Sequence, residues 1–467
     1  MLKAIISVRA PRLLPSRFAL PRPTLATTAE FILLLALLAS FGHVVRFFLL
    51  QGYLPQPFIW DPNDTFMDWF NPAYWANHWG AYSVWRSIYP PLSFVTLRMF
   101  SISSCYVTTP FAARDCDWLS ITAILVMYAA AVAVTYAALR RNDPRTAIMR
   151  TLAFAFGYRT LFALERGNLL IICYIAMVVA FGFCAGSRPV RAIAAALMIN
   201  YKPYMLLPTL AWAIRRDWRQ LELAGIFTIL IYLASWSVVG SGSLLELADN
   251  TVNWIRVTGD DVVAEIYYAT SFNGLLGVID RGAFPILRFF RSDSYEMFRM
   301  IIDTAMVVAQ VAGLAALVLA WAQPRAVPLH RLACILLLLS LTNRSPGGYT
   351  EMLVMFLVFL EPWRGFARIA SITLMYLGGL SVDLMISAVP PVNSFSWLGG
   401  HAVSAEFGIA VGQFAHPAGL LLVLLLLSLD TIVAATRAYR TDRPTLALGT
   451  PKPAILELSG APANVKA

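Results

Sequence analysis

Long apolar runs, separated by short clusters of arginine, constrain the fold of this chain more than any other feature. A helix needs about 20 apolar residues to cross a bilayer. The runs predict membrane helices near 28–50, 118–139, 150–165, 168–186, 190–200, 203–214, 222–240, 300–322, 329–345, 349–361, 366–388 and 410–436. Three of these, 190–200, 203–214 and 349–361, are too short to cross alone. They are predicted to be half-helices or broken helices that line a cavity or contact protein.

Composition indicates the same class of protein. Hydrophobic residues make up 59% of the chain and charged residues only 13%, with a mean hydropathy of +0.66. A soluble domain carries about 25% charged residues. The formal net charge is +10, but the basic residues lie in short clusters between the apolar runs, as topology determinants do. The sequence therefore predicts an all-α polytopic membrane protein with no nucleic-acid partner.

The basic clusters also predict the orientation, because cytoplasmic loops carry an excess of Lys and Arg. They lie at 1–27, 140–150, 187–191, 215–219, 323–331, 362–368 and beyond 437. This spacing predicts that both termini lie in the cytoplasm. The expected membrane is the inner (plasma) membrane of the cell. The basic ends of 187–219 predict a hairpin or a re-entrant pair of helices with its tip at Tyr201-Lys202-Pro203.

Three regions follow from this orientation. Residues 1–27 form a basic cytoplasmic N-terminus, which fits either a signal anchor or a mitochondrial transit peptide. The anchor is favoured because the next apolar run is too long for a cleaved signal. Residues 28–436 form a single domain of about 10 to 12 membrane segments. Its outer loops, 51–117 and 241–299, are rich in aromatic residues and predict amphipathic surface helices. The proline-containing segment 437–467 is predicted to be a disordered cytoplasmic tail.

Polar residues next to the apolar layer are the candidate functional residues, because charge there is costly and usually functional. The first outer loop carries Asp61, Asp64 and Asp68 among aromatic residues. Later turns carry Glu165-Arg166-Gly167-Asn168, Lys202, and Asn343-Arg344 with Glu351. On the predicted orientation all four segments converge on the outer face. Taken singly, Arg166 or Lys202 is equally well explained as snorkelling or as a partner of Glu165.

This combination of charges favours one chemistry. Cations can hold the phosphate of a lipid-linked substrate, Arg as a fork and Lys as a point charge. A nearby carboxylate can remove the proton of an attacking hydroxyl group. Together they predict glycosyl transfer from a lipid-phosphate donor. The histidines show no ligand spacing, so neither a metal nor another cofactor is predicted; they are His43, His78, His330, His401 and His416.

Several motifs resemble one family. Asp68-Trp69-Phe70 followed by Tyr89-Pro90-Pro91 is similar to the first-loop signature of the polyprenyl-phosphate-sugar-dependent glycosyltransferases with the GT-C fold, specifically glycosyltransferase family 87, the α-mannosyltransferase-like group. Arg166-Gly167-Asn168-Leu169-Leu170 is similar to a later turn of that family, and Asn200-Tyr201-Lys202-Pro203 to its Lys-Pro segment. Ser345-Pro346 is similar to its Ser-Pro turn.

The resemblance implies an enzyme that moves a hexose, mannose-like by analogy, from a polyprenyl-phosphate donor to a lipid or glycan acceptor in the membrane, with inversion. It places the base at Asp68, with Asp64 as the rival and Asp61 third. The substrate contacts that follow are Tyr89, Arg166, Asn168, Lys202, Asn343, Arg344 and Glu351. Family members often carry His after the Ser-Pro turn, where this chain has Tyr349, Thr350 and Glu351. That departure leaves the acceptor contacts and the sugar open.

Other functions are compatible with a basic polytopic chain. A transporter or flippase of lipid-linked sugars should show charges deep within the spans or paired repeats, and the sequence has few of the former and none of the latter. A polysaccharide polymerase or ligase would share the outer-face chemistry but relies on a large late loop. A structural or assembly role without activity is the third alternative.

The cysteines indicate one further feature. Cys173, Cys184 and Cys334 lie within apolar runs and are most simply packing residues. Cys105 and Cys116 share the first outer loop, where an oxidising compartment permits a disulfide. They are the disulfide candidates of this chain.

Overall fold

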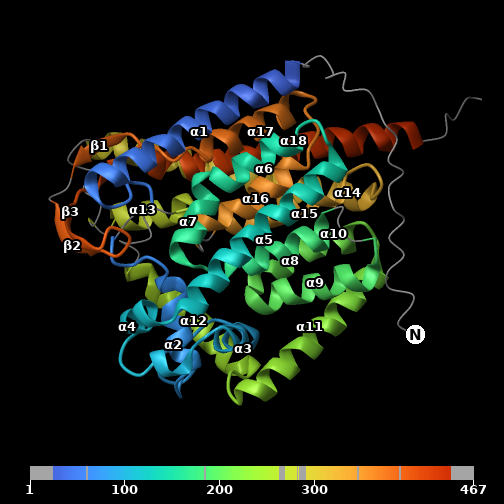
Figure 1. The fold of residues 1–467 in the computed structure, drawn as a ribbon. Coiled ribbons are helices and arrows are strands. Elements are labelled where there is room, and N and C mark those ends of the chain that lie inside the picture. Colours follow the sequence, from blue (N-terminus) through green and yellow to red (C-terminus); the bar gives the residue numbers. More distant parts are fainter. Residues whose placement is uncertain are drawn as a thin grey trace, which may run out of the picture.

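The structure is a computed structural model in which almost every described segment is helical (Figure 1). It describes residues 25–58, 61–182, 186–261, 269–280, 282, 291–343, 347–388 and 391–442. Within these ranges, five helices are long and apolar enough to cross a membrane. They are α1 (Leu25–Gln51), α5 (Trp118–Asn142), α11 (Trp218–Val239), α14 (Ser292–Ala322) and α18 (Gly412–Asp442). The prediction of an all-α polytopic membrane protein is confirmed.

Shorter helices complete the bundle. They are α2 (Met67–Ala76), α3 (Pro91–Met99), η2 (Ser103–Cys105), α4 (Pro110–Cys116), α6 (Ala147–Phe156), α7 (Tyr158–Arg166), α8 (Leu170–Phe181), α9 (Arg188–Tyr201), η3 (Pro203–Met205), α10 (Leu206–Ile214), α12 (Leu244–Asp261), α13 (Phe272–Asp280), α15 (Leu329–Leu341), η6 (Gly348–Thr350), α16 (Glu351–Phe359) and α17 (Phe366–Gly378). All nine residues of α16 are buried, as expected for a helix that is apolar all round after its first residue, Glu351, and that packs on α6, α8, α15 and α17. The core of the bundle therefore lies around α16 (Figure 1).

The predicted span 150–165 is wrong, because α6 and α7 are separate helices that meet at Gly157. Gly157 has extended backbone angles, with φ −74° and ψ 142°, so the helical ladder cannot continue through it. The amide of Tyr158 instead donates to the carbonyl of Gly379, 2.8 Å away at the end of α17. Apolar composition continues across this position, which is why hydropathy joined the two helices.

The predicted span 366–388 is also wrong, because α17 ends at Gly378 and strands follow. Strand β1 (Met385–Ala388) pairs antiparallel with β4 (Gly408–Ala410), and β2 (Val392–Ser396) pairs antiparallel with β3 (His401–Ala405). The amide of Trp397, in the turn between β2 and β3, donates to the carbonyl of Pro62 at 3.2 Å. The β2–β3 hairpin therefore packs on the first loop.

The helices in the loops 51–117 and 241–299 were predicted, but the C-terminal tail begins later than predicted. Helices α2, α3 and α4 lie in the loop 51–117, and α12 and α13 lie in 241–299. Helix α18 continues to Asp442, beyond the predicted boundary at 437, because this stretch contains good helix formers such as Ala438 and Arg440. The remaining predictions for 1–24 and 443–467 concern segments outside the described residues.

The bundle has two distinct ends. Helix α5 starts beside α4 in the first loop, and its 25 residues carry the chain about 37 Å to the α5–α6 turn. We call these the first-loop end and the opposite end. Arg188, at the start of α9, pairs with Asp217 after α10 (Nη2 to Oδ1, 3.7 Å), so the segment between them enters and returns. The tip of this segment is Lys202, as the sequence predicts.

Candidate functional site

The first loop is folded by a tight turn at Asp61. Pro62 follows it, and the Asp61 carboxylate accepts the amide of Asn63 at 2.9 Å, while the Asp61 carbonyl accepts the amide of Asp64 at 2.9 Å. Proline after an aspartate is typical of such turns. The chain then passes through Phe66, whose φ is +65°, and enters α2 at Met67. Asp64 thus lies just before α2, and Asp68 lies in its first turn.

Both of these carboxylates contact the turn between α7 and α8. The Arg166 guanidinium donates to Asp68 Oδ1 from Nη2 at 2.6 Å and from Nε at 3.2 Å, and Nη1 donates to Asp64. Asn168 Nδ2 donates to Asp68 Oδ2 at 2.7 Å. The side chains of Asp64, Asp68 and Arg166 are 27%, 20% and 19% exposed, so the group is partly buried but open to solvent. We call Asp64, Asp68, Arg166 and Asn168 the carboxylate cluster.

Electrostatics distinguish the two acids. Burial raises the pKa of Asp64 above its usual value, and the neighbouring charge of Asp68 raises it further. The Arg166 guanidinium lowers that pKa through its charge and its hydrogen bond. Asp68 receives three N–H donors from two residues, which fixes the orientation of its carboxylate.

Gly167 allows the loop and the α7–α8 turn to meet. It ends α7 in the left-handed region, with φ +63°, where glycine is favoured. A Cβ there would lie 3.2 Å from the Phe66 Cα atom and 3.2 Å from the Trp69 Cβ atom. The Phe66 amide donates to the Glu165 carbonyl at 2.7 Å across this contact. Any larger residue would push the two segments, and with them the cluster, apart.

Sequence reasoning missed Arg114, which fixes the loop from the other side. Its guanidinium donates to the Asn63 carbonyl and to Asn63 Oδ1 at 3.1 Å, and to the Thr65 carbonyl at 3.1 Å. It also lies 4.9 Å from the Trp397 ring centroid, a cation–π contact with the β2–β3 hairpin. Trp397 Nε1 donates in turn to Asp115 at 2.8 Å. A single arginine in a loop carries no local sequence signal for such a role.

Lys202 lies at the same end of the bundle. Its Nζ is 4.5 Å from the centroid of the Tyr89 ring, and Tyr89 packs against the apolar cluster that contains Met67 and Phe70 of α2. The preceding Tyr201 is fixed by a 2.7 Å hydrogen bond to Thr96 of α3. Among the described residues, no carboxylate forms a salt bridge with Lys202, so its charge is available to a ligand.

Glu351 is not at an exposed turn, and that expectation is wrong. It is 1% exposed and pairs with Arg159, at the far end of α7 from Arg166. His416 Nδ1 lies 3.9 Å from Glu351 Oε2. The seven residues from Arg159 to Arg166 correspond to about 10 Å of helix, so this pair lies deeper in the bundle than the carboxylate cluster. A buried carboxylate needs such a partner.

The later turn is placed only in part. Asn343 is exposed just after α15, and its carbonyl accepts Asn273 Nδ2 at 3.0 Å. Within the described residues, none of its contacts joins it to the carboxylate cluster. Arg344, with Ser345 and Pro346, lies outside the described residues. No group of three or more His, Cys, Asp or Glu in the described part of the chain could hold a metal ion, and the expectation that none is needed stays a prediction.

Cys105 and Cys116 are joined in the structure, with their Cα atoms 5.6 Å apart at the ends of η2 and α4. We predict that this bond forms in the native membrane and contributes about 2 to 3 kcal/mol to loop stability by restricting the unfolded chain. Mass spectrometry of protein purified without reductant should find this pair oxidised. The buried Cys173 and Cys334 serve as thiol controls and should stay reduced. Alkylation of Cys105 and Cys116 without prior reduction would contradict the prediction.

The fold and this site define a polytopic helical membrane protein with a charged cluster where its first loop meets the bundle. A model of glycosyltransferase family 87 matches residues 87–342, more than half of the chain. The chain therefore belongs to glycosyltransferase family 87 and is a membrane glycosyltransferase of the GT-C type. Comparison with curated proteins and with solved structures gives no match.

The matched range divides the site residues. It includes Tyr89, Arg166, Asn168 and Lys202. Asp64 and Asp68 precede it, and Asn343 and Glu351 follow it. The family match thus covers Tyr89, Arg166, Asn168 and Lys202 without assigning them a role, and the acids of the first loop lie outside it.

Proposed function

We propose that this chain transfers a sugar, mannose-like by the family resemblance, from a polyprenyl-phosphate donor to a hydroxyl group of a lipid or glycan acceptor. One observation carries the proposal: Asp68 is held by Arg166 and Asn168 at the open first-loop end, with Lys202 at the same end. An oriented carboxylate and an available cation are the two groups that this transfer needs.

The proposed reaction is a direct displacement. The acceptor oxygen attacks the anomeric carbon while Asp68 takes the hydroxyl proton as general base. The bond between that carbon and the phosphate oxygen breaks, and its electron pair leaves with the polyprenyl phosphate. One bond to the anomeric carbon forms and one breaks on opposite faces, so its configuration inverts. No covalent enzyme intermediate is needed.

The contacts assign different parts to the two cations. Arg166 was expected to bind the donor phosphate, but all three of its guanidinium nitrogens donate to Asp64 or Asp68. We infer that Arg166, with Asn168, orients the base. Lys202 is the cation that can stabilise the departing phosphate as a point charge. The Tyr89 ring beside it limits where the ammonium group can lie.

The proposed location is the inner (plasma) membrane, with the first-loop end on the extracytoplasmic side. Most basic clusters lie in turns at the opposite end, including Arg145 and Arg364, which supports a cytoplasmic position for that end. The donor and acceptor would then meet where their lipid phosphates lie, at the outer headgroup level.

The test is an assay of the purified full-length protein with a labelled polyprenyl-phosphate mannose and a membrane-lipid extract as acceptor. We expect a labelled product of inverted anomeric configuration and the release of polyprenyl phosphate. Asp68→Asn protein, purified in parallel, is the matched control for contaminating transferases. The proposal would be refuted by equal product from the wild type and from both Asp68→Asn and Asp64→Asn, or by transport of the intact donor across proteoliposomes without transfer.

A further inference from the structure

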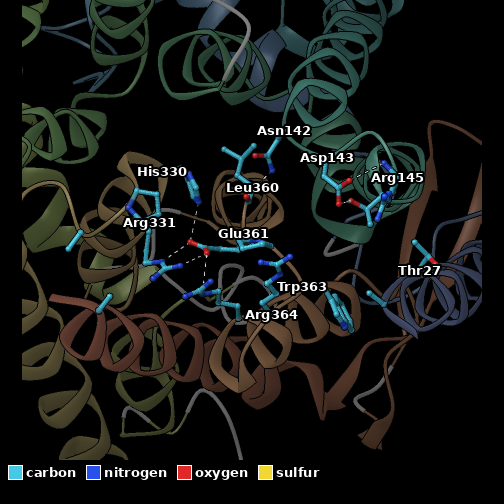
Figure 2. A pocket seen from close by; sticks show the side chains of 17 residues that line it. Thr27, Asn142, Asp143, Arg145, His330, Arg331, Leu360, Glu361, Trp363 and Arg364 are labelled. Carbon is cyan, nitrogen blue, oxygen red and sulfur yellow. Dashed lines mark hydrogen bonds and ion pairs between the residues drawn. The ribbon is translucent and has the colours of Figure 1, made fainter. Parts of the chain in front are cut away.

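A cavity of about 690 Å³ opens at the opposite end of the bundle and is lined by several charged side chains (Figure 2). It is bordered by the α5–α6 turn, the turn before α15, the α16–α17 turn and the start of α1. Four arginines and two carboxylates line it: Arg145, Arg331, Arg364, Arg368, Asp143 and Glu361. Ile124 of α5 lies next to Gly167, and Asn142 on the cavity rim follows it 18 positions later, which corresponds to about 27 Å of helix. This cavity is therefore separate from the carboxylate cluster.

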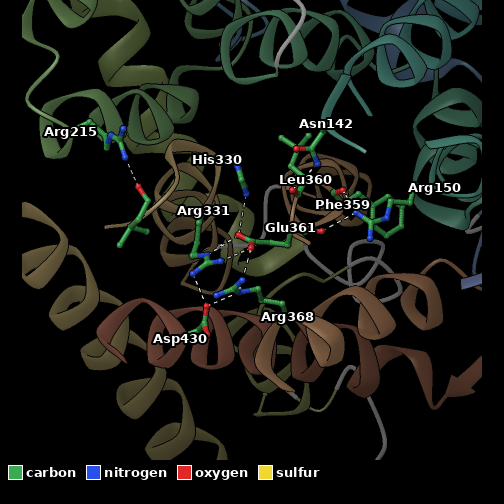
Figure 3. A network of polar contacts seen from close by, with 11 residues as sticks. Asn142, Arg150, Arg215, His330, Arg331, Phe359, Leu360, Glu361, Arg368 and Asp430 are labelled. Carbon is green, nitrogen blue, oxygen red and sulfur yellow. Dashed lines mark hydrogen bonds and ion pairs between the residues drawn. The ribbon is translucent and has the colours of Figure 1, made fainter. Parts of the chain in front are cut away.

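The inner wall of the cavity is a fixed ionic network (Figure 3). Arg331 donates to Glu361 from Nε at 2.7 Å and to Asp430 from Nη1 at 2.6 Å. Arg368 Nε donates to Asp430 at 2.9 Å, and His330 Nε2 lies 3.2 Å from Glu361. These contacts neutralise the buried Glu361 and the partly exposed Asp430 with two arginines. They make a rigid wall and leave its net charge near zero.

The remaining arginines of the cavity carry charge without such partners. Arg145 and Arg364 are exposed, and among the described residues neither guanidinium has a hydrogen-bond or salt-bridge partner; only their backbone amides are bonded. The nearby Asp143 is occupied, because it accepts the Arg145 amide and the Thr146 hydroxyl, both at 3.1 Å. Figure 2 shows Arg145 and Arg364 reaching the cavity from different turns. The two arginines therefore outnumber the one remaining carboxylate, Asp143, so the rim carries a net positive charge.

Helix ends add to this field. Three helices begin at lining residues: α6 after Thr146, α15 after Pro328, and α17 next to Arg364. A helix N-terminus carries a partial positive charge and free amide groups, which favour an anion. The cavity thus combines two unpaired guanidinium groups with three helix N-termini.

The geometry points to a binding site for the phosphate of an anionic phospholipid headgroup. The end of a helix that crosses the bilayer lies at headgroup level, and Trp363 and the 82% exposed Phe366 lie on the same turn, as interfacial aromatic residues do. Basic pockets between membrane helices bind such headgroups. The site is independent of the proposed glycosyl transfer, and its occupancy would anchor the opposite end of the bundle in the lipid leaflet.

The test compares three forms of the full-length protein purified in a neutral detergent. They are the wild type, the double variant Arg145→Gln with Arg364→Gln, and the control Arg219→Gln. Arg219 is exposed at the start of α11, at the same end, but does not line the cavity. Each is titrated with phosphatidylglycerol, with phosphatidylcholine or with inorganic phosphate. Bound lipid is counted by native mass spectrometry, and the shift in Tm is followed in parallel.

We expect phosphatidylglycerol to be retained and to raise the Tm of the wild type and of Arg219→Gln, whereas the double variant should bind it about 10-fold more weakly or worse. Phosphatidylcholine should have little effect on any form. Equal retention by the double variant and the wild type, or equal losses in the double variant and the control, would overturn the proposal. Inorganic phosphate acting as well as phosphatidylglycerol would overturn the lipid assignment in favour of a free anion.

Discussion

Asp68→Asn is expected to lower kcat for sugar transfer about 100-fold or more, the usual effect of losing a positioned base. Asparagine keeps the size of the side chain and can still face Arg166 and Asn168, but it cannot take the acceptor proton. Steady-state assays with saturating donor and acceptor measure the effect. The donor KM should change little, because Asp68 acts on the acceptor.

Asp64→Asn is the matched control, because Asp64 lies on the same loop and contacts the same arginine. It should keep kcat within about 10-fold of the wild type if Asp68 is the base. A dead Asp64→Asn beside an active Asp68→Asn would move the base one turn earlier, to the acid whose pKa is raised by burial. Full activity in both variants would make the loop structural and exclude this mechanism.

Arg166→Ala should also lower kcat about 100-fold, because it frees both carboxylates from the bridge that orients them. Without the guanidinium, Asp64 and Asp68 repel each other, which raises the pKa of Asp64 further. Whichever of the two acids is the base must be deprotonated to act, and loss of a positive charge beside it disfavours the ionised form. The acid limb of the profile of kcat/KM against pH should therefore move to higher pH, so that activity is lost earlier as the pH falls.

Lys202→Ala provides the contrast. Its ammonium group contacts the Tyr89 ring and no carboxylate among the described residues, so its loss should raise the donor KM and leave the acid limb in place. Arg166→Lys should recover little activity, because a single ammonium group cannot bridge two acids as the guanidinium does. A raised donor KM with an unchanged pH profile in Arg166→Ala would assign phosphate binding to Arg166 after all.

Hydropathy predicted the long helices well, because one property, about 20 apolar residues, decides whether a segment can cross. It failed where the property that matters is local backbone geometry. Gly157 divides an apolar run in two, and the chain after Gly378 leaves the helix for strands. Apolar content reports burial in the bilayer but not where a helical ladder stops.

For the site, the sequence predicted where the charged residues lie but not how they pair. That the first-loop acids, Arg166 and Lys202 lie at one end of the bundle followed from the spacing of apolar runs and basic clusters. Which charge pairs with which did not, because pairing depends on how the loop packs on the α7–α8 turn. Arg166 was therefore assigned to phosphate, whereas its hydrogen bonds go to Asp64 and Asp68. Glu351 was placed at the surface, whereas it lies in the core beside Arg159.

The acids of the first loop are held by residues that are synthesised much later than the loop itself. Asp68 is translated 98 residues before its partner Arg166. Asp61 is translated 333 residues before Ser394 of the β2–β3 hairpin, whose hydroxyl group donates a hydrogen bond to the Asp61 carboxylate. A ribosome-bound intermediate therefore inserts its first helices while the first-loop acids still lack the hydrogen-bond donors, Arg166 and Ser394, that orient them in the complete protein. The first-loop site is therefore complete only after nearly the whole polypeptide has been made.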